Sequence, residues 1–200
     1  MSSGEHLLRN GANLSAWLMW LQTNSPEAFG RINEVLRDLF EDISHVKTTP
    51  MQDGKVFFAV QEKGLKRPIP VWQGSDGLLV LTALLSLIYS PPEFSGTLYC
   101  IEQPENHLHP RLLETLVALL RQVRQEIRDA KGSPVQIIVT TQSPYLVDQM
   151  EIDEIIWIEK LNGETKAFHP SEKAHLRKLV EAKELGLADI VYSGILAEEK

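Results

Sequence analysis

The densest group of chemically capable side chains lies in the segment LYCIEQPENHLHP, residues 98–110. An apolar run ends at Glu102, Gln103 follows it, and the histidines His107 and His109 precede a proline. Carboxylates beside imidazoles can bind a metal, act as an acid and a base, or lie beside a nucleotide. These residue types therefore leave three kinds of site open.

A catalytic metal site is the weakest of the three. His107 and His109 could supply two ligands from one face of a strand, with Glu105 nearby. The strand should end by Glu102, however, and a helix should begin directly after the second histidine. The other histidines are scattered along the chain and do not complete a ligand shell. A metal hydrolase that uses Glu105, His107 and His109 remains a third hypothesis.

A nucleotide site accounts for the same segment through magnesium. A carboxylate at the C-terminal tip of an apolar strand can hold Mg²⁺ near the phosphates through water, and Glu102 is so placed. A second acid directly after it would orient and deprotonate the attacking water. That next position is Gln103, which can hold a water but cannot accept its proton.

Two further loops lie at the ends of predicted buried elements, and the ends of strands are where open α/β sheets place their sites. The loop formed by Gly74, Ser75, Asp76 and Gly77 can present backbone N–H groups and a hydroxyl at a helix N-terminus. The same residues also make an ordinary helix cap. The segment VTTQSPYLV ends another apolar run with Gln142, whose amide can donate to a phosphate oxygen, or which simply lies in a strand-to-helix turn.

A phosphate-binding loop of the type G-x-x-x-x-G-K-[ST] is absent from the sequence. The sole Gly-Lys pair, Gly54-Lys55, has Thr49 in place of the first glycine and Val56 in place of the Ser or Thr, and a strand follows it. The chain therefore carries the distal half of a nucleotide site. We expect the other half to have been removed or to come from another polypeptide.

The periodicity of apolar residues predicts an α/β lobe with a parallel sheet and a helical N-terminal part. We expect one lobe over residues 1–200, helical over 1–50, with the chemical loops within 51–200. A strand, a long helix, a strand, a helix and a strand in this order build a parallel sheet. The predicted elements are helices over 14–21 and 26–40, a strand over 55–61, a buried helix over 78–89, a buried strand over 98–102, an amphipathic helix over 110–130, a buried strand over 135–141, and a hairpin around Asn162-Gly163.

Composition narrows the class of protein. The net charge of −7 argues against a nucleic-acid-coating protein, and the single Cys100 suits a reducing cytoplasm. No signal-peptide pattern opens the chain, and the longest apolar run, 78–89, is too short to span a bilayer, so we expect a cytoplasmic chain with no membrane partner. A basic stripe on the long helix favours a solvated face over a nucleic-acid contact, because Glu126 and Asp129 interleave with Arg121, Arg124, Arg128 and Lys131.

The three loops together resemble, in order and spacing, the C-terminal lobe of ABC-type ATPases of the AAA class, in the RecF/SMC-like group that includes the OLD-type bacterial defence ATPases. GSDGLLVLTALLSL resembles the signature loop and helix of this group, and LYCIEQPENHLHP resembles its Walker B segment. IIVTTQSPYLV resembles the switch segment, and LGLADIVYSGIL resembles the tail.

This resemblance implies a P-loop NTPase-like fold that uses ATP and Mg²⁺. It assigns Glu102 to magnesium, Gln103 to the position of the catalytic glutamate and Gln142 to that of the switch histidine. It places Ser75, within the nucleotide-binding loop, on the γ-phosphate of a nucleotide held by the opposite protomer. Gln142 keeps a hydrogen-bond donor, whereas Gln103 lacks the carboxylate that would take up a proton during hydrolysis.

The implied function is ATP-dependent dimerisation that switches a partner in DNA repair or phage defence. The implied partners are a lobe that carries the phosphate loop, a second copy of the chain, and DNA as a further candidate. ATP hydrolysis would require the completed site. The alternative is a degenerate or split ATPase lobe that does not hydrolyse ATP and acts as an interaction module.

Overall fold

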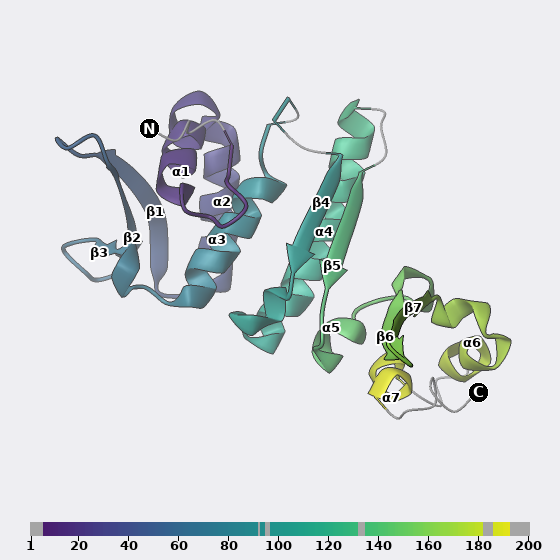
Figure 1. Ribbon diagram of the computed structural model, residues 1–200. Helices are drawn as coiled ribbons and strands as arrows, with labels where there is room; N and C mark the ends of the chain where they lie inside the picture. The colour runs from purple at the N-terminus through teal and green to yellow at the C-terminus, as the bar shows by residue number, and fades with distance from the viewer. Residues whose placement is uncertain (1–5, 92, 95–96, 132–134, 182–185, 193–200) are drawn as a thin grey trace. The chain divides into compact units, whose positions relative to one another are not determined.

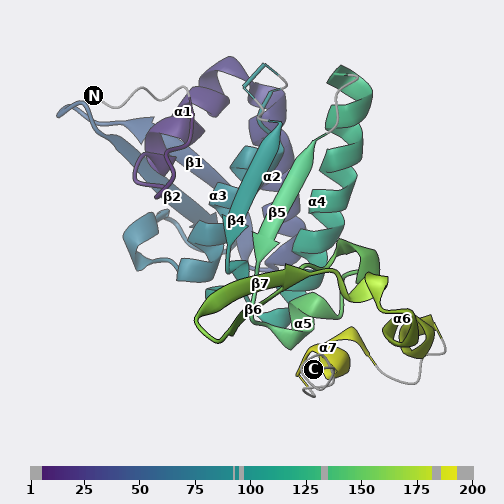
Figure 2. The same cartoon turned by 45° about the vertical axis from the view of Figure 1, so that its right-hand side comes forward.

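The computed structural model describes residues 6–91, 93–94, 97–131, 135–181 and 186–192, and Figures 1 and 2 show its elements. The chain divides into two compact units, Met1–Val139 and Thr140–Lys200. The segments that resemble the signature and Walker B belong to the first unit. The switch segment begins in the last strand of the first unit, and its residues from Thr140 onward belong to the second. Whether one functional lobe comprises both units, as the sequence led us to expect, stays a prediction.

Two helices open the first unit. Helix α1, Leu14–Asn24, buries one apolar face that includes Trp17, and helix α2, Pro26–Leu39, begins with its proline in the first turn. Trp17 is 1% exposed and stacks on Trp20 with ring centroids 5.3 Å apart. Trp17 therefore belongs to the core, and the half-buried Trp20 packs beside it.

A three-stranded antiparallel sheet follows the two helices and lies beside them (Figure 1). Its strands are β1, Ile43–Pro50, β2, Val56–Glu62, and β3, Ile69–Pro70. Strand β1 lies within the range 1–50 that we expected to be helical. Its apolar residues, Ile43 and Val46, are spaced as on a helix, but the pairing of Val46 with Val60 on β2 decides for a strand.

The candidate site is built on a strand–helix–strand unit. Helix α3, Asp76–Ile88, precedes strand β4, Leu98–Glu102, a short 3₁₀ turn η2, Pro104–Asn106, and helix α4, Pro110–Lys131. Strand β5, Gln136–Thr140, returns beside β4, and both arrows point the same way in Figures 1 and 2. The parallel pair connected by a helix is the predicted arrangement.

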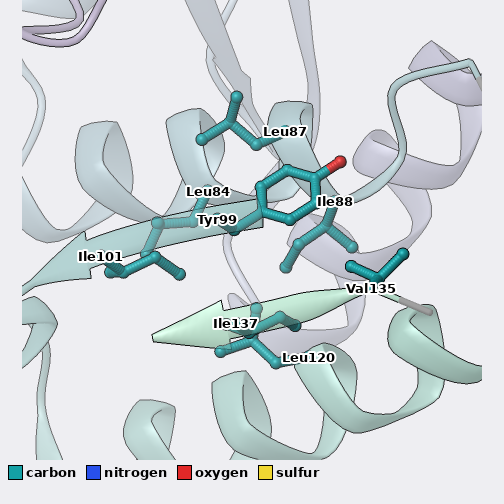
Figure 3. A pocket seen from close by; sticks show the side chains of 8 residues that line it. All are labelled: Leu84, Leu87, Ile88, Tyr99, Ile101, Leu120, Val135 and Ile137. Atoms are coloured by element: carbon teal, nitrogen blue, oxygen red, sulfur yellow. The ribbon is translucent and has the colours of Figure 1, made fainter. Parts of the chain in front are cut away.

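The β4–β5 sheet buries one face against α3 and α4. In Figure 3, side chains of both strands and both helices surround a cavity of about 10 Å³, at the lower limit for a single water. The opposite face leaves Leu98 50% exposed and Ile138 54% exposed. The two strands, which we predicted to be buried, are therefore buried on one face alone, because α3 and α4 do not cover the second face of the two-stranded sheet. The residues around the cavity are Leu84, Leu87, Ile88, Tyr99, Ile101, Leu120, Val135 and Ile137.

The second unit is a small α/β structure with its own core. Strands β6, Trp157–Leu161, and β7, Glu164–Phe168, form the predicted hairpin, in which Asn162 and Gly163 both have positive φ, as a tight primed turn requires. Strand β6, the third strand of the expected parallel order, therefore does not join β4 and β5: it pairs with β7 in an antiparallel sheet, because the two-residue turn returns the chain directly beside it. The helices of this unit are α5, Pro144–Val147, α6, Ala174–Glu181, and α7, Leu187–Tyr192, and its 3₁₀ turns are η3, Ile152–Glu154, and η4, Pro170–Glu172. The remaining 3₁₀ turn with a defined range, η1, Val71–Gln73, belongs to the first unit. Its buried core consists of Val147, Ile152, Leu176, Leu187, Ala188 and Ile190.

Within the described residues, no helix is long and apolar enough to cross a membrane.

Candidate functional site

The loop predicted as the signature loop, residues 74–77, lies at the N-terminus of α3 with its polar side chains exposed. Ser75 is the N-cap residue, and its hydroxyl oxygen accepts a hydrogen bond of 3.3 Å from the backbone N–H of Leu78. Ser75 and Asp76 are exposed. The two interpretations of this loop are compatible, since a hydroxyl that accepts one bond as a cap still has its hydrogen to donate to an anion.

The signature loop and the Walker B loop meet at Gly77. A Cβ added at this glycine would lie 2.6 Å from the carbonyl oxygen of His107, which is closer than real Cβ atoms approach. The absence of a side chain therefore lets the first turn of α3 pack directly against the backbone that follows β4. Two of the three segments selected from the sequence thus come together within the first unit.

We predict that Gly77→Ala destabilises the protein by about 1–3 kcal/mol, because the new methyl group would displace the backbone of the neighbouring loop. Alanine normally stabilises a helix relative to glycine by up to about 1 kcal/mol, so the sign of the change is diagnostic. Gly30→Ala in α2 is the matched control, since no atom lies within 4 Å of its added Cβ. Denaturant unfolding of both variants measures the difference, and equal stabilisation by both would contradict the close contact.

Glu102 and Gln103 lie at the C-terminal end of β4, where the backbone turns sharply. Glu102 is exposed, and Gln103 adopts a left-handed conformation with φ 41° and ψ 59°. This conformation is unfavourable by roughly 1–2 kcal/mol for a residue with a side chain. Asn106 stabilises the turn, since its backbone N–H donates to the Gln103 carbonyl at 3.2 Å and its side-chain amide donates to Gln103 Oε1 at 3.1 Å. Strained backbone of this kind is concentrated at functional sites.

The histidine pair is part of a helix entrance. His107 ends the 3₁₀ turn η2, and Nδ1 of His109 accepts a hydrogen bond of 3.3 Å from the backbone N–H of Arg111 in the first turn of α4. Across the part of the chain that the structure describes, no three His, Cys, Asp or Glu side chains are grouped to hold a metal ion. The metal-hydrolase hypothesis therefore gains no geometric support.

Gln142 belongs to the second unit, where it follows β5 and is exposed. Its backbone carbonyl accepts a hydrogen bond from the hydroxyl of Tyr192 in α7. At the other end of the same helix, the backbone N–H of Ala188 donates to Asp148 Oδ1 at 2.9 Å. The tail thus bonds to the switch segment at Gln142 and to the residue directly after it, Asp148. The sequence analysis quoted the tail as a motif but assigned no role to Tyr192.

The chemistry of these groups fits a nucleotide with Mg²⁺. Glu102 offers exposed carboxylate oxygens, which are the hard ligands that Mg²⁺ prefers. Ser75 and the first turn of α3 offer a hydroxyl and the positive end of a helix, which suit a phosphate oxygen. Residues for the remaining phosphates are lacking, because the sequence has no phosphate loop.

The basic stripe on α4 is solvated where its side chains are described. Arg121 and Arg124 are exposed, and Glu126 between the basic positions lies 3.5 Å from Arg31 of α2 and 2.8 Å from Gln122. The side chains of Arg128 and Lys131 lie outside the described residues.

The parallel strand–helix–strand unit, with a carboxylate at the strand tip and a capped helix beside it, is the P-loop NTPase-like fold of ABC- and AAA-type ATPases. Residues 2–148 match the family described as "AAA domain, putative AbiEii toxin, Type IV TA system". Because the match covers more than half of the chain, the protein belongs to this family of ATPase domains.

Solved structures with a similar fold are heads of SMC proteins. A chain from a study of ATP-driven dimerisation and DNA-stimulated activation of SMC ATPases has a TM-score of 0.57 and 18% sequence identity, over 82% of this chain and 96% of that chain. The Smc head domain with a coiled coil and joint from Pyrococcus yayanosii has a TM-score of 0.55 and 17% identity, over 87% of this chain. The Smc head of Pyrococcus furiosus bound to the C-terminal domain of ScpA has a TM-score of 0.53 and 15% identity, over 83% of this chain. At these identities the similarity shows the fold alone.

The chain spans 32% of the Pyrococcus yayanosii head structure and 40% of the Pyrococcus furiosus one. No functionally curated protein is similar enough in sequence to count as a match.

Proposed function

We propose that the chain is the signature and Walker B lobe of an ABC-class, RecF/SMC-like ATPase, and that a phosphate-loop lobe completes its nucleotide site. The observation that carries this proposal is the contact between Gly77 and His107, which joins the signature loop to the Walker B loop in one unit. A shared site would require these two loops to be adjacent, and the close approach at Gly77 leaves no room for a side chain between them.

The β4–β5 sheet supports the proposal of a missing lobe. Half-exposed Leu98 and Ile138 on its second face are large apolar side chains that a neighbouring element would bury with a gain in free energy. The two longer Smc head structures extend well beyond the part that this chain matches. The lobe could be joined in the same polypeptide or come from another one, and the complete protein would dimerise with ATP.

In the completed site, bound Mg²⁺ would supply positive charge beside the phosphates. Glu102 would hold it through water, and Ser75 would donate a hydrogen bond to the γ-phosphate across the dimer interface. Gln103 would hold the attacking water, and Gln142 of the switch segment would donate its amide hydrogen to a phosphate oxygen. Tyr192 would position the switch segment through the Gln142 carbonyl.

The isolated chain is expected to bind Mg-ATP weakly, with a dissociation constant well above the micromolar range, because the phosphate loop normally supplies most phosphate contacts. Adding a lobe that carries the phosphate loop should then produce a complex that forms with ATP. Calorimetry on the 200-residue chain, followed by light scattering of the mixture, measures both steps. Low-micromolar binding by the chain alone, or indifference of the mixture to ATP, would contradict the proposal.

A second candidate function is a non-hydrolysing ATPase lobe that acts as an interaction module. The glutamine at position 103 favours it, because an amide cannot take up the proton of the attacking water. Both candidate functions predict that the two lobes associate when ATP is present. They differ in whether the complete assembly then releases phosphate. For both candidate functions we propose that the protein belongs to the OLD-like bacterial group and acts in the cytoplasm. Its role would be in phage defence or DNA repair.

A further inference from the structure

The antiparallel sheet of the first unit has one face that packs on α1 and α2 and one that faces away from them. Phe58 and Val60 of β2, with their partners on β1, are buried on the packed face. Because side chains alternate along a strand, the residues between them lie on the opposite side, which we call the outward face. It consists of His45, Lys47, Thr49, Phe57, Ala59 and Gln61. Ala59, at the centre between Lys47 and Pro70, is 0% exposed, so the accessible part of this face is formed by the longer side chains around it.

The outward face ends in an exposed aromatic pair. Trp72, in the 3₁₀ turn η1 that follows β3, is 68% exposed. Its indole meets the ring of Phe57 edge to face, with centroids 5.5 Å apart and an interplanar angle of 76°. Phe57 is itself half-buried, so the indole is supported in place while most of its surface stays open. An open indole held by a second aromatic ring can serve as a stacking surface for a ligand.

The charge of the region is opposite to that of the whole chain. Residues 45–73 contain five lysine and arginine residues and two carboxylates, although the chain carries a net charge of −7. Asp53 is 3.2 Å from Lys55, so this carboxylate is already paired. Glu62 lies two residues after Val60, so its side chain is on the same, packed side of the sheet. There it lines a pocket with Ile43 and Ser75. The strands therefore place no described carboxylate on the outward face.

The cations are spread along the direction of β2. Lys47 lies opposite Ala59 in the middle of the outward face, and Lys66 and Arg67 lie exposed in the turn from β2 to β3. Phe57 and Trp72 lie at the other end of β2, about five residues or roughly 15 Å from this turn. An aromatic platform at one end is thus followed by positive charges in the middle and at the other end, over the length of a few nucleotides.

We propose that the outward face binds single-stranded nucleic acid, with a base stacked on Trp72 and the backbone phosphates beside Lys47 and Arg67. Exposed aromatic rings next to spaced cations are the device by which proteins bind single strands without sequence preference. A duplex keeps its bases stacked on one another and could use the cations but not the indole. This inference does not depend on the nucleotide site proposed above.

The test is binding of a fluorescently labelled 12-residue oligothymidylate to the full 200-residue chain, measured by anisotropy at low and at physiological salt. We expect binding that weakens with salt, together with quenching of the Trp72 fluorescence. Trp72→Leu should weaken binding by about fivefold or more, since stacking on one aromatic side chain contributes about 1–3 kcal/mol. The double variant Lys47→Gln, Arg67→Gln should reduce the dependence of the binding constant on salt.

Matched controls come from the second unit. Tyr145→Leu removes an aromatic side chain that is 61% exposed, and Lys160→Gln removes an exposed lysine, so both should leave binding unchanged. The proposal fails if the oligothymidylate does not bind at low salt, or if Trp72→Leu binds it as well as the original chain does. It also fails if a duplex of equal length binds more tightly, or if polyglutamate displaces the strand and shows the same dependence on Trp72, which would indicate an acidic protein partner. Circular dichroism checks that each variant is folded.

Discussion

Gln103→Glu is expected to accelerate ATP hydrolysis by at least about tenfold in the assembled two-lobe protein. General-base catalysis contributes typically about 10²–10⁴-fold, and a carboxylate can accept the proton of the attacking water where an amide cannot. Glutamines that orient water serve in some GTPases, so the original protein should retain slow turnover. The measurement is phosphate release at saturating ATP from the original assembly and from the variant.

The local structure makes this substitution informative. Glutamate is nearly isosteric with glutamine, and one of its oxygens can accept the hydrogen bond that Asn106 now donates to Gln103 Oε1. The left-handed turn after β4 should therefore persist, and the change should affect chemistry more than structure. Gln103→Met is the matched control, because it keeps the length of the side chain without an oxygen and should not exceed the original rate. Equal rates for the original and the Gln103→Glu protein would mean that residue 103 is not at the base position or that another step is slow.

Ser75→Arg is expected to abolish association driven by ATP. The side chain of Ser75 is exposed at the N-terminus of α3, so a long arginine would extend into the space where a nucleotide from the opposite protomer should bind. Loss of the N-cap alone should cost about 1 kcal/mol, which leaves a folded protein. Light scattering of the two-lobe mixture with and without ATP measures the effect.

Two further substitutions separate the cap from the site. Ser75→Thr keeps a hydroxyl and a cap and should associate normally, whereas Ser75→Ala removes both without adding bulk and should weaken association. If the arginine variant associates as the original does while its circular dichroism is unchanged, residues 74–77 are a helix cap and not a signature loop.

The elements predicted correctly are those whose signals are local. Helix α3 follows a capping serine, and the β6–β7 hairpin follows from Asn162-Gly163, since these residues favour the positive φ that a primed turn requires. Strand β1 was missed because its form is decided by pairing with β2, whose partner residues lie 6 to 19 positions further along the chain. The exposure of Leu98 and Ile138 was missed for a related reason, because apolar residues alone do not say which faces of a sheet are covered.

The sequence by itself determined which groups are available for chemistry. The hydroxyl of Ser75, the carboxylate of Glu102 and the amides of Gln103 and Gln142 are properties of residue type, and so is the absence of a phosphate loop. Only the tertiary structure decided which of these groups are held in place by contacts with other segments of the chain. The contact of Gly77 with the His107 carbonyl joins segments 30 residues apart, and the bond from Tyr192 to the Gln142 carbonyl joins segments 50 residues apart. Such contacts depend on how helices and strands pack, whereas capping, turn and periodicity signals act over a few residues along the chain.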